Sequence, residues 1–175
     1  MERNSRSGIP NNLMKNNKKS LLNECKIIKE NCEYTAEAHF TRAKTVKNIY
    51  LWLQLIPATI VAIVGGVIVA GKTVPEFVGW LTTISAIITG CTAVLNPLQE
   101  YYQCFNAGNA FTRLKQEARS LKDTYSENLS ITELTVRIHS LQEKYGDICS
   151  LSPLTDEDAF SAGRVKIKSG IHDPD

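Results

Sequence analysis

Two long stretches of the sequence lack any charged residue. No Asp, Glu, Lys or Arg occurs between Lys47 and Lys72, and none occurs between Glu76 and Glu100. As helices, their apolar parts of about 22 and about 19 residues would be about 33 Å and about 28 Å long, close to the roughly 30 Å of hydrocarbon in a bilayer. Two such gaps in succession are rare in soluble proteins, so the absence of charge predicts two membrane spans joined by a short loop.

Features of secreted and nucleic-acid-binding proteins are also lacking. The five cysteines are odd in number and Cys91 falls inside the second span, so we expect reduced thiols in a cytosolic compartment rather than a disulfide framework. The first 20 residues contain no apolar segment of a secretory signal, so the first span is expected to act as its own signal. With a net charge of +2 and no dense basic patch, no nucleic acid is expected as a partner.

These observations predict an all-α membrane protein, a two-span helical hairpin whose long cytoplasmic helices form a bundle. Basic residues flank the spans on one side and the connecting loop offers only Lys72, so the positive-inside rule places both termini in the cytoplasm. The expected segments are a flexible polar N-terminus (1–19), a cytoplasmic helix (20–48), the first span (49–70), an external loop (71–76), the second span (77–98), a cytoplasmic helical hairpin (99–150) and a C-terminal tail with room for one short helix (151–175).

Apolar residues recur at helical spacing on both sides of the spans. Between Leu21 and Cys32 they form one seam, which predicts a helix that continues into the first span. Pro97 is expected to kink the helix of the second span without stopping it. Ser130 and Glu133 have the spacing of a capping box, which predicts a helix start. The helices after the spans are expected to pack through Phe111, Leu114, Leu121, Tyr125, Leu134, Ile138, Leu141 and Tyr145.

Small polar side chains follow one face of the second span. This hydroxyl stripe recurs at alternating spacings of three and four and consists of Thr82, Ser85, Thr89, Thr92 and Asn96. We expect the stripe to face a neighbouring subunit or to line a pore. The alternative is that these hydroxyls bond only to the backbone of their own helix.

Small-residue tracks run along both spans and would permit close helix contact. They consist of Ala58, Ala62, Gly66 and Ala70 in the first span and Gly79, Thr83, Ala86, Gly90 and Ala93 in the second. We expect these tracks to pack span against span.

One enzyme pattern occurs, and its context argues against a function. Residues 66–73 match the phosphate-loop pattern G-x-x-x-x-G-K-[ST], but β-branched residues within it continue the span and no helix directly follows it. Cys25, Cys32 and His39 are separated by about 10.5 Å per interval along a helix, too far for one zinc ion. We expect no enzymatic activity, no catalytic residue, no cofactor and no metal, and nucleotide hydrolysis ranks last among the alternatives.

The order of these segments resembles a known family. After the second span, a long helix opens with Asn96, Pro97 and Leu98 and continues through 107–114 (AGNAFTRL), and 153–159 (PLTDEDA) form the closing segment of the resemblance. In this organisation residues 20–168 are similar to the SLATT family of two-span bacterial effector domains. The resemblance implies a place in the bacterial inner membrane and pore formation that kills or arrests the cell in anti-phage defence, beside a nucleotide-signalling or sensor partner. It carries over no catalytic residue.

Two functions follow as hypotheses. In the first, the chain assembles in the lipid bilayer into a homo-oligomer that forms a pore or disrupts the membrane, because two spans alone cannot enclose a channel. In the second, the chain is a non-conducting scaffold whose spans tether the helical bundle.

Overall fold

The computed structural model of the chain describes residues 11–71, 73, 75–155 and 157–169, without the side chains of 11–13. This part of the chain is helical and contains no strand, so the all-α prediction is confirmed. Its elements are α1 (Asn11–Val69), α2 (Phe77–Leu95), α3 (Pro97–Ser120), the π-helical turn η1 (Leu121–Tyr125), α4 (Ile131–Leu151) and α5 (Glu157–Lys168).

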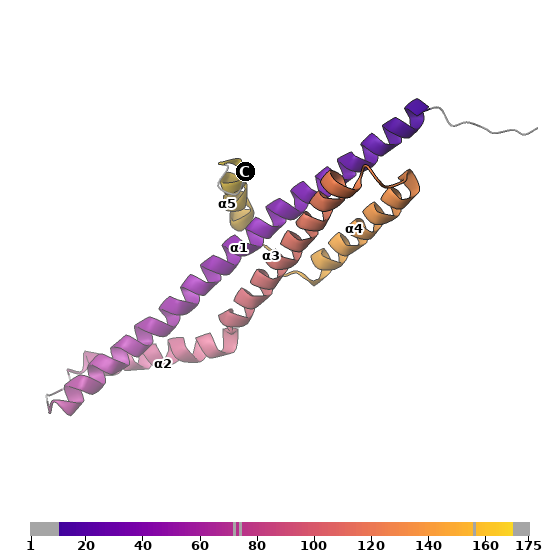
Figure 1. Ribbon diagram of the computed structural model, residues 1–175. Helices are drawn as coiled ribbons and strands as arrows, with labels where there is room; N and C mark the ends of the chain where they lie inside the picture. Colours follow the sequence, from indigo (N-terminus) through magenta and orange to yellow (C-terminus); the bar gives the residue numbers. More distant parts are fainter. Residues whose placement is uncertain (1–10, 72, 74, 156, 170–175) are drawn as a thin grey trace, which may run out of the picture.

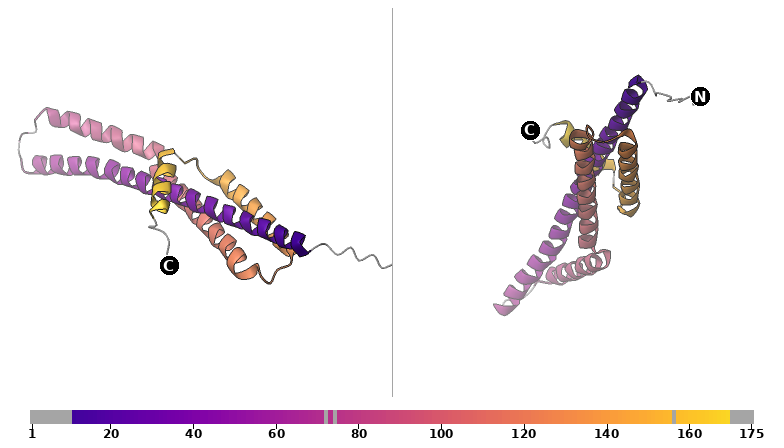
Figure 2. Two further views of the ribbon diagram at one scale, coloured as in Figure 1. Left: turned by 90° about the horizontal axis from the view of Figure 1, so that it is seen from above. Right: turned by 45° about the vertical axis from the view of Figure 1, so that its right-hand side comes forward.

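α1 is a continuous helix of 59 residues that runs along most of the length of the molecule (Figure 1). At 1.5 Å per residue it is about 88 Å long. Its first half lies against α3 and α4, and its last part runs beside α2 (Figure 2). The helix begins at Asn11, so residues 11–19 are helical rather than flexible as expected, and 1–10 lie outside the described residues. A helical start is consistent with the straight, unbranched side chains of Lys15, Lys18 and Lys19, which favour helix.

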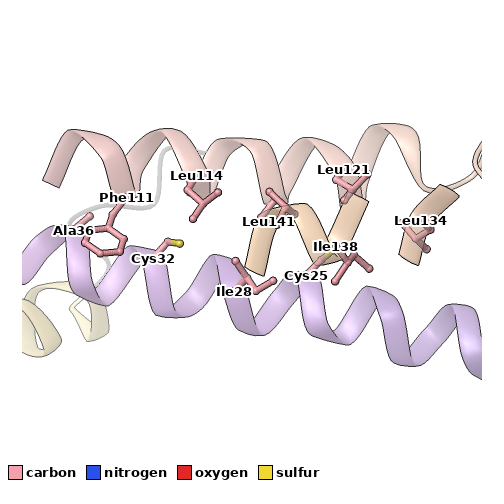
Figure 3. Packing of buried hydrophobic residues seen from close by; sticks show 11 residues of the cluster. Cys25, Ile28, Cys32, Ala36, Phe111, Leu114, Leu121, Leu134, Ile138 and Leu141 are labelled. Carbon is pink, nitrogen blue, oxygen red and sulfur yellow. The ribbon is translucent and has the colours of Figure 1, made fainter. Parts of the chain in front are cut away.

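The core of the helical bundle lies where α1, α3 and α4 meet (Figure 3). Tyr145 packs against its edge, with its ring 5.8 Å from that of Phe111. The buried cluster consists of Cys25, Ile28, Cys32, Ala36, Phe111, Leu114, Ala118, Leu121, Leu134, Ile138 and Leu141. Six of the eight residues expected to pack the cytoplasmic helices belong to this cluster.

Tyr125 departs from that expectation because η1 is a π-helical turn. A three-and-four spacing assumes α-helix throughout, whereas the wider π turn delays the next inward position by one residue. Ser126 is therefore buried in the place expected for Tyr125, which is 57% exposed. Ser126 donates a hydrogen bond to the Lys122 carbonyl oxygen at 2.6 Å, which satisfies its buried hydroxyl.

α2 and α3 are separate helices that meet at Asn96. This residue has φ 44° and ψ 57°, in the left-handed region, and its N–H still bonds to the Thr92 carbonyl oxygen at 3.1 Å. α3 then begins at Pro97, a position where proline's missing N–H costs no helical hydrogen bond. The prediction that Pro97 kinks a continuous helix is therefore wrong, and the second apolar helix ends at Leu95 rather than at 98.

The start of α4 has the capping box that its sequence predicts. The Ser130 hydroxyl accepts a hydrogen bond from the Glu133 N–H at 3.3 Å, and the Glu133 carboxylate accepts one from the Ser130 N–H at 2.9 Å. Hydrogen bonds from Ser130 also hold the pKa of Glu133 below its usual value. After α4, the short helix α5 crosses α1 on the side opposite α3 and α4 (Figures 1 and 2).

Candidate functional site: the apolar helical hairpin

The apolar hairpin, formed by residues 49–69 of α1 together with α2, exposes large apolar side chains over most of its surface. Both helices are long and apolar enough to cross a membrane, and only 6% of the most apolar window in α1 and 11% of that in α2 are buried. A core helix of a soluble protein would be mostly buried. The large apolar side chains exposed by half or more are Ile49, Leu51, Trp52, Leu55, Val61, Ile63, Ile68, Val69, Phe77, Trp80, Ile84, Ile87, Val94 and Leu95. Such a surface favours a hydrocarbon environment over water.

The hydroxyl stripe is divided between the inside and the outside of the hairpin. Ser85 and Thr92 are only 1% and 5% exposed, although they lie on an otherwise exposed helix whose neighbour is α1. Thr82 is half-buried, whereas Thr89 and Asn96 are exposed. Asn96 lies outside α2 and ends it, so it does not continue the stripe.

Each hydroxyl of the stripe donates to a carbonyl oxygen of its own helix. The distances from Thr82, Ser85, Thr89 and Thr92 to these oxygens are 2.8, 2.8, 2.9 and 2.7 Å. The O–H donors are therefore used within α2, as in the alternative that the sequence left open. The oxygen lone pairs are what the stripe can offer to a second group.

The small-residue tracks do not pack span against span within the chain, so that expectation is wrong for the single hairpin. A β-carbon added to Gly66, Gly79 or Gly90 would meet no atom within 4 Å. The whole of both tracks is exposed, comprising Ala58, Ala62, Gly66, Ala70, Gly79, Thr83, Ala86, Gly90 and Ala93. Larger residues of α1 lie on the side of α2 instead, since the half-buried Ile60 and Val64 border a groove shared with α2. These larger side chains offer more van der Waals contacts than alanine and glycine would.

The hairpin is packed more tightly at one end than at the other. Ser85, at the middle of α2, and Thr92, near the end that leads to α3, are buried. In the half near the connecting loop, an open groove of about 330 Å³ separates the two helices. It is lined by Ile60, Ile63, Val64, Val67, Pro75, Phe77, Val78 and Leu81.

Charged and aromatic residues join α1 to α3 directly beyond the apolar hairpin. The Arg42 guanidinium donates to one Glu100 carboxylate oxygen through Nε at 3.0 Å and Nη2 at 2.7 Å. Lys47 Nζ lies 6.0 Å from the centre of the Tyr101 ring. Glu100 is the first charge after the second apolar stretch, so this ion pair joins α1 to α3 close to the apolar hairpin.

A second set of ion pairs was not identified from the sequence. Lys115 of α3 donates to Glu33 at 3.0 Å, and Lys166 of α5 donates to Glu37 at 2.6 Å. Glu37 and Lys166 are 129 residues apart. Glu33 and Glu37 lie one helical turn apart on α1, a spacing that could have indicated a charged face of this helix.

The buried titratable groups of the bundle lack the arrangement of a catalytic or metal site. Burial raises the pKa of the Cys32 thiol to about 12 and also raises the pKa of Cys25 and Cys104, which keeps these thiols protonated and unreactive. Burial lowers the pKa of His39, whose ring stacks on Phe111 at 5.6 Å and whose Nδ1 has no hydrogen-bond partner in the part of the chain that the structure describes. Among the described residues, no group of three His, Cys, Asp or Glu side chains could hold a metal ion.

The phosphate-loop pattern is divided between a helix and a loop. Residues 66–69 form the last turn of α1, and the next helix begins only at Phe77. Lys72, which would contact phosphate in such a loop, lies outside the described residues. The helical backbone at 66–69 uses its N–H groups in helical hydrogen bonds rather than presenting them to an anion.

Comparisons of the chain with models of protein families, with curated proteins and with solved structures find no match. The resemblance to the SLATT family thus remains a prediction from the order of segments. The functional interpretation rests on the geometry of the apolar hairpin and of the bundle joined to it.

Proposed function

We propose that the chain is a two-span membrane effector that assembles into homo-oligomers and permeabilises the bacterial inner membrane. The observation that carries this proposal is the exposed, uncharged surface of the apolar hairpin, joined without a break to a packed helical bundle through α1. Burying a side chain such as Leu or Phe in hydrocarbon contributes about 1.5–3 kcal/mol, and more than a dozen large apolar side chains are available. Insertion into the bilayer is therefore strongly favoured.

Charge sets the proposed orientation. Lys44 and Lys47 precede the first span, and Arg113 and Lys115 follow the second. By the positive-inside rule, this places the bundle and both termini in the cytoplasm and the short loop outside. The Arg42–Glu100 ion pair then lies at the cytoplasmic edge of the membrane, where it couples the two spans to the bundle.

The small-residue tracks provide the proposed contacts between subunits. They face outward from each hairpin, and glycine and alanine allow helices to approach closely in lipid, where packing rather than hydrophobicity drives association. A β-carbon added at Gly79 or Gly90 would meet no atom of the described residues within 4 Å, so such a change would interfere with assembly while leaving the single hairpin intact.

Opening of the proposed pore requires α2 to change its contact with α1. Ser85 and Thr92 are covered in the resting hairpin, and they can line a lumen only after α2 rotates or moves away. The apolar groove near the loop favours such a movement, because the helices already contact each other less closely there. A nucleotide-signalling or sensor partner acting on the bundle would supply the trigger, and growth arrest of an infected cell would be the outcome.

A non-conducting membrane scaffold is the second candidate. It is favoured by the hydroxyl stripe, whose O–H groups are already bonded within α2. In this case the bundle alone is functional, and the spans serve as an anchor.

Membrane potential in bacteria that express the full chain from a tight promoter distinguishes the two candidates. The pore predicts rapid depolarisation by the wild type and loss of depolarisation in a stripe variant with Thr82→Val, Ser85→Ala, Thr89→Val and Thr92→Val. The matched control is Thr59→Val, which removes an equally back-bonded hydroxyl from the other span and should depolarise like the wild type. Normal potential with the inserted wild-type protein would favour the scaffold.

Assembly is tested by the same measurement with Gly79→Val and Gly90→Val. These changes should prevent both cross-linking between subunits and depolarisation. Gly146→Val is the control, because this glycine also has no atom within 4 Å of an added β-carbon but lies in α4, outside the hairpin.

A further inference from the structure

We propose that α5 is a latch: docked on α1 it holds the effector at rest, and its release from α1 activates the effector. This inference rests on the proposed function. The contact is specific, since a β-carbon on Gly163 would lie 3.2 Å from the Ala38 backbone nitrogen and 3.3 Å from Cγ of Glu37. Beside it, Lys166 Nζ donates to Glu37 Oε1 at 2.6 Å and to Thr41 Oγ1 at 3.2 Å.

α5 completes a ring of contacts around α1. Four consecutive residues of α1, at 36–39, are buried, with exposures of 5%, 8%, 0% and 2%. Because four consecutive residues point to all sides of a helix, α1 is enclosed at this level. Ala36 and His39 face the core and the Phe111 ring, whereas Glu37 and Ala38 face α5.

The enclosed level lies close to the proposed membrane. Residue 39 is ten residues before residue 49, which corresponds to about 15 Å along a helix. α1 continues through this distance without a break. A ring around α1 at this level therefore restrains rotation and sliding of the first span relative to α3 and α2.

Release of α5 from α1 requires little free energy. The buried residues of its contact face are Ala159, with one methyl group, and Gly163, with no side chain, so the contact buries little apolar area. The Lys166–Glu37 ion pair makes the contact specific. It contributes little net stability, because the desolvation of the two charges offsets their attraction. On the outer face, Phe160 and Val165 are 40% and 68% exposed, so this face of α5 is largely open to solvent.

Reversal of one charge tests the contact. Lys166→Glu places two carboxylates together and should release α5, which is measured as faster amide hydrogen exchange in 157–168 of the full chain. In vesicles of phosphatidylethanolamine and phosphatidylglycerol, dye leakage by this variant should exceed that of the wild type at least fivefold. The swapped pair Glu37→Lys with Lys166→Glu should restore slow exchange and low leakage. Lys168→Glu makes the same charge change at an exposed position of α5 and should behave like the wild type.

A reversible covalent lock provides the opposite test. Glu37→Cys with Gly163→Cys, in a background of Cys91→Ser and Cys149→Ser, places two thiols across the 3.3 Å contact, where a disulfide can form. Diamide removes two electrons and two protons from the thiols as the S–S bond forms, and dithiothreitol reverses the reaction. The oxidised protein should leak slowly, and leakage should rise after reduction, because reduction leaves α5 without its ion pair.

The outcomes separate the latch from the pore. Leakage that rises in Lys166→Glu and falls in the swapped pair supports the latch. The latch is overturned if Lys166→Glu leaves amide exchange in α5 unchanged, or if exchange becomes fast while leakage stays unchanged. Either result overturns the latch alone when the wild type still leaks at high protein density, as the pore predicts. If the inserted wild type and all variants fail to cause leakage at any protein density, both the latch and the pore are overturned.

Discussion

The ring of Phe40 occupies the space that a β-carbon on Gly108 would need. Three ring carbons lie 2.7, 2.9 and 2.9 Å from that position, nearer than side-chain carbons approach one another. The same ring meets Phe105 edge-on at 5.9 Å between centroids. Glycine at 108 therefore sets the close spacing of α1 and α3 directly beyond the apolar hairpin.

Gly108→Ala is expected to destabilise the bundle. Alanine favours helix by about 1 kcal/mol over glycine, but displacing the Phe40 ring costs roughly 1–3 kcal/mol, so we expect a net loss of about 1 kcal/mol. Gly146→Ala is the matched control, because its β-carbon enters open space and should raise stability. Urea unfolding of the full chain in detergent, followed by circular dichroism, measures both. Equal stabilisation by the two alanines would show that Phe40 does not limit the spacing.

His39 is expected to make the bundle less stable in acid. Burial lowers its pKa below 6.5 in the folded chain, so the unfolded chain binds a proton first as the pH falls. The free energy of unfolding therefore has its full value above about pH 6.5. Below that pH it declines, by at most about 1.4 kcal/mol per pH unit. His39→Phe keeps a flat ring against Phe111 and removes the titration.

The measurement for His39 is the pH dependence of the unfolding free energy. From about pH 7 to about pH 5, the wild type should lose more stability than His39→Phe. Parallel profiles for wild type and His39→Phe would contradict the burial of a neutral imidazole.

Asn96 is expected to tolerate glycine better than alanine. Its left-handed backbone costs a residue with a β-carbon about 1–2 kcal/mol, and glycine avoids this cost. Both variants lose the hydrogen bond from the Asn96 amide to Gln99 Oε1 at 3.1 Å, so their difference isolates the backbone. The free energy of unfolding of Asn96→Gly should be about 1 kcal/mol higher than that of Asn96→Ala. Equal values would mean that α2 continues into α3 as one helix.

The sequence predicted helices well where the determinants are local. Uncharged apolar runs and the Ser130–Glu133 capping box depend on neighbouring residues, and the structure has helices at these places. The π turn at η1 was missed because it adds a single residue to a helical repeat without altering its composition, and it shifts the residues that follow to another face. The left-handed Asn96 was missed because the end of α2 depends on the backbone conformation of this one residue.

Helix facing was harder to predict than helix formation. Small residues such as Gly66 and Gly79 permit close contact, but the spacing does not specify which helix makes it, and the chain places larger residues between its own two apolar helices. The Glu37–Lys166 contact joins segments 129 residues apart. Such a pair depends on how α5 folds back onto α1, and the spacing of apolar residues along the sequence does not predict this.

The side of the membrane reached by the connecting loop tests the central claim most directly. Glu76→Cys, in a Cys91→Ser background, places a thiol at the exposed start of α2, while the native Cys149 is exposed on α4 and the other three cysteines are buried. A membrane-impermeant maleimide should label the thiol introduced by Glu76→Cys in cells whose outer membrane alone has been opened, and Cys149 only after the inner membrane is disrupted. Labelling of both thiols before disruption, or recovery of the chain in the soluble fraction, would contradict a two-span hairpin with a cytoplasmic bundle.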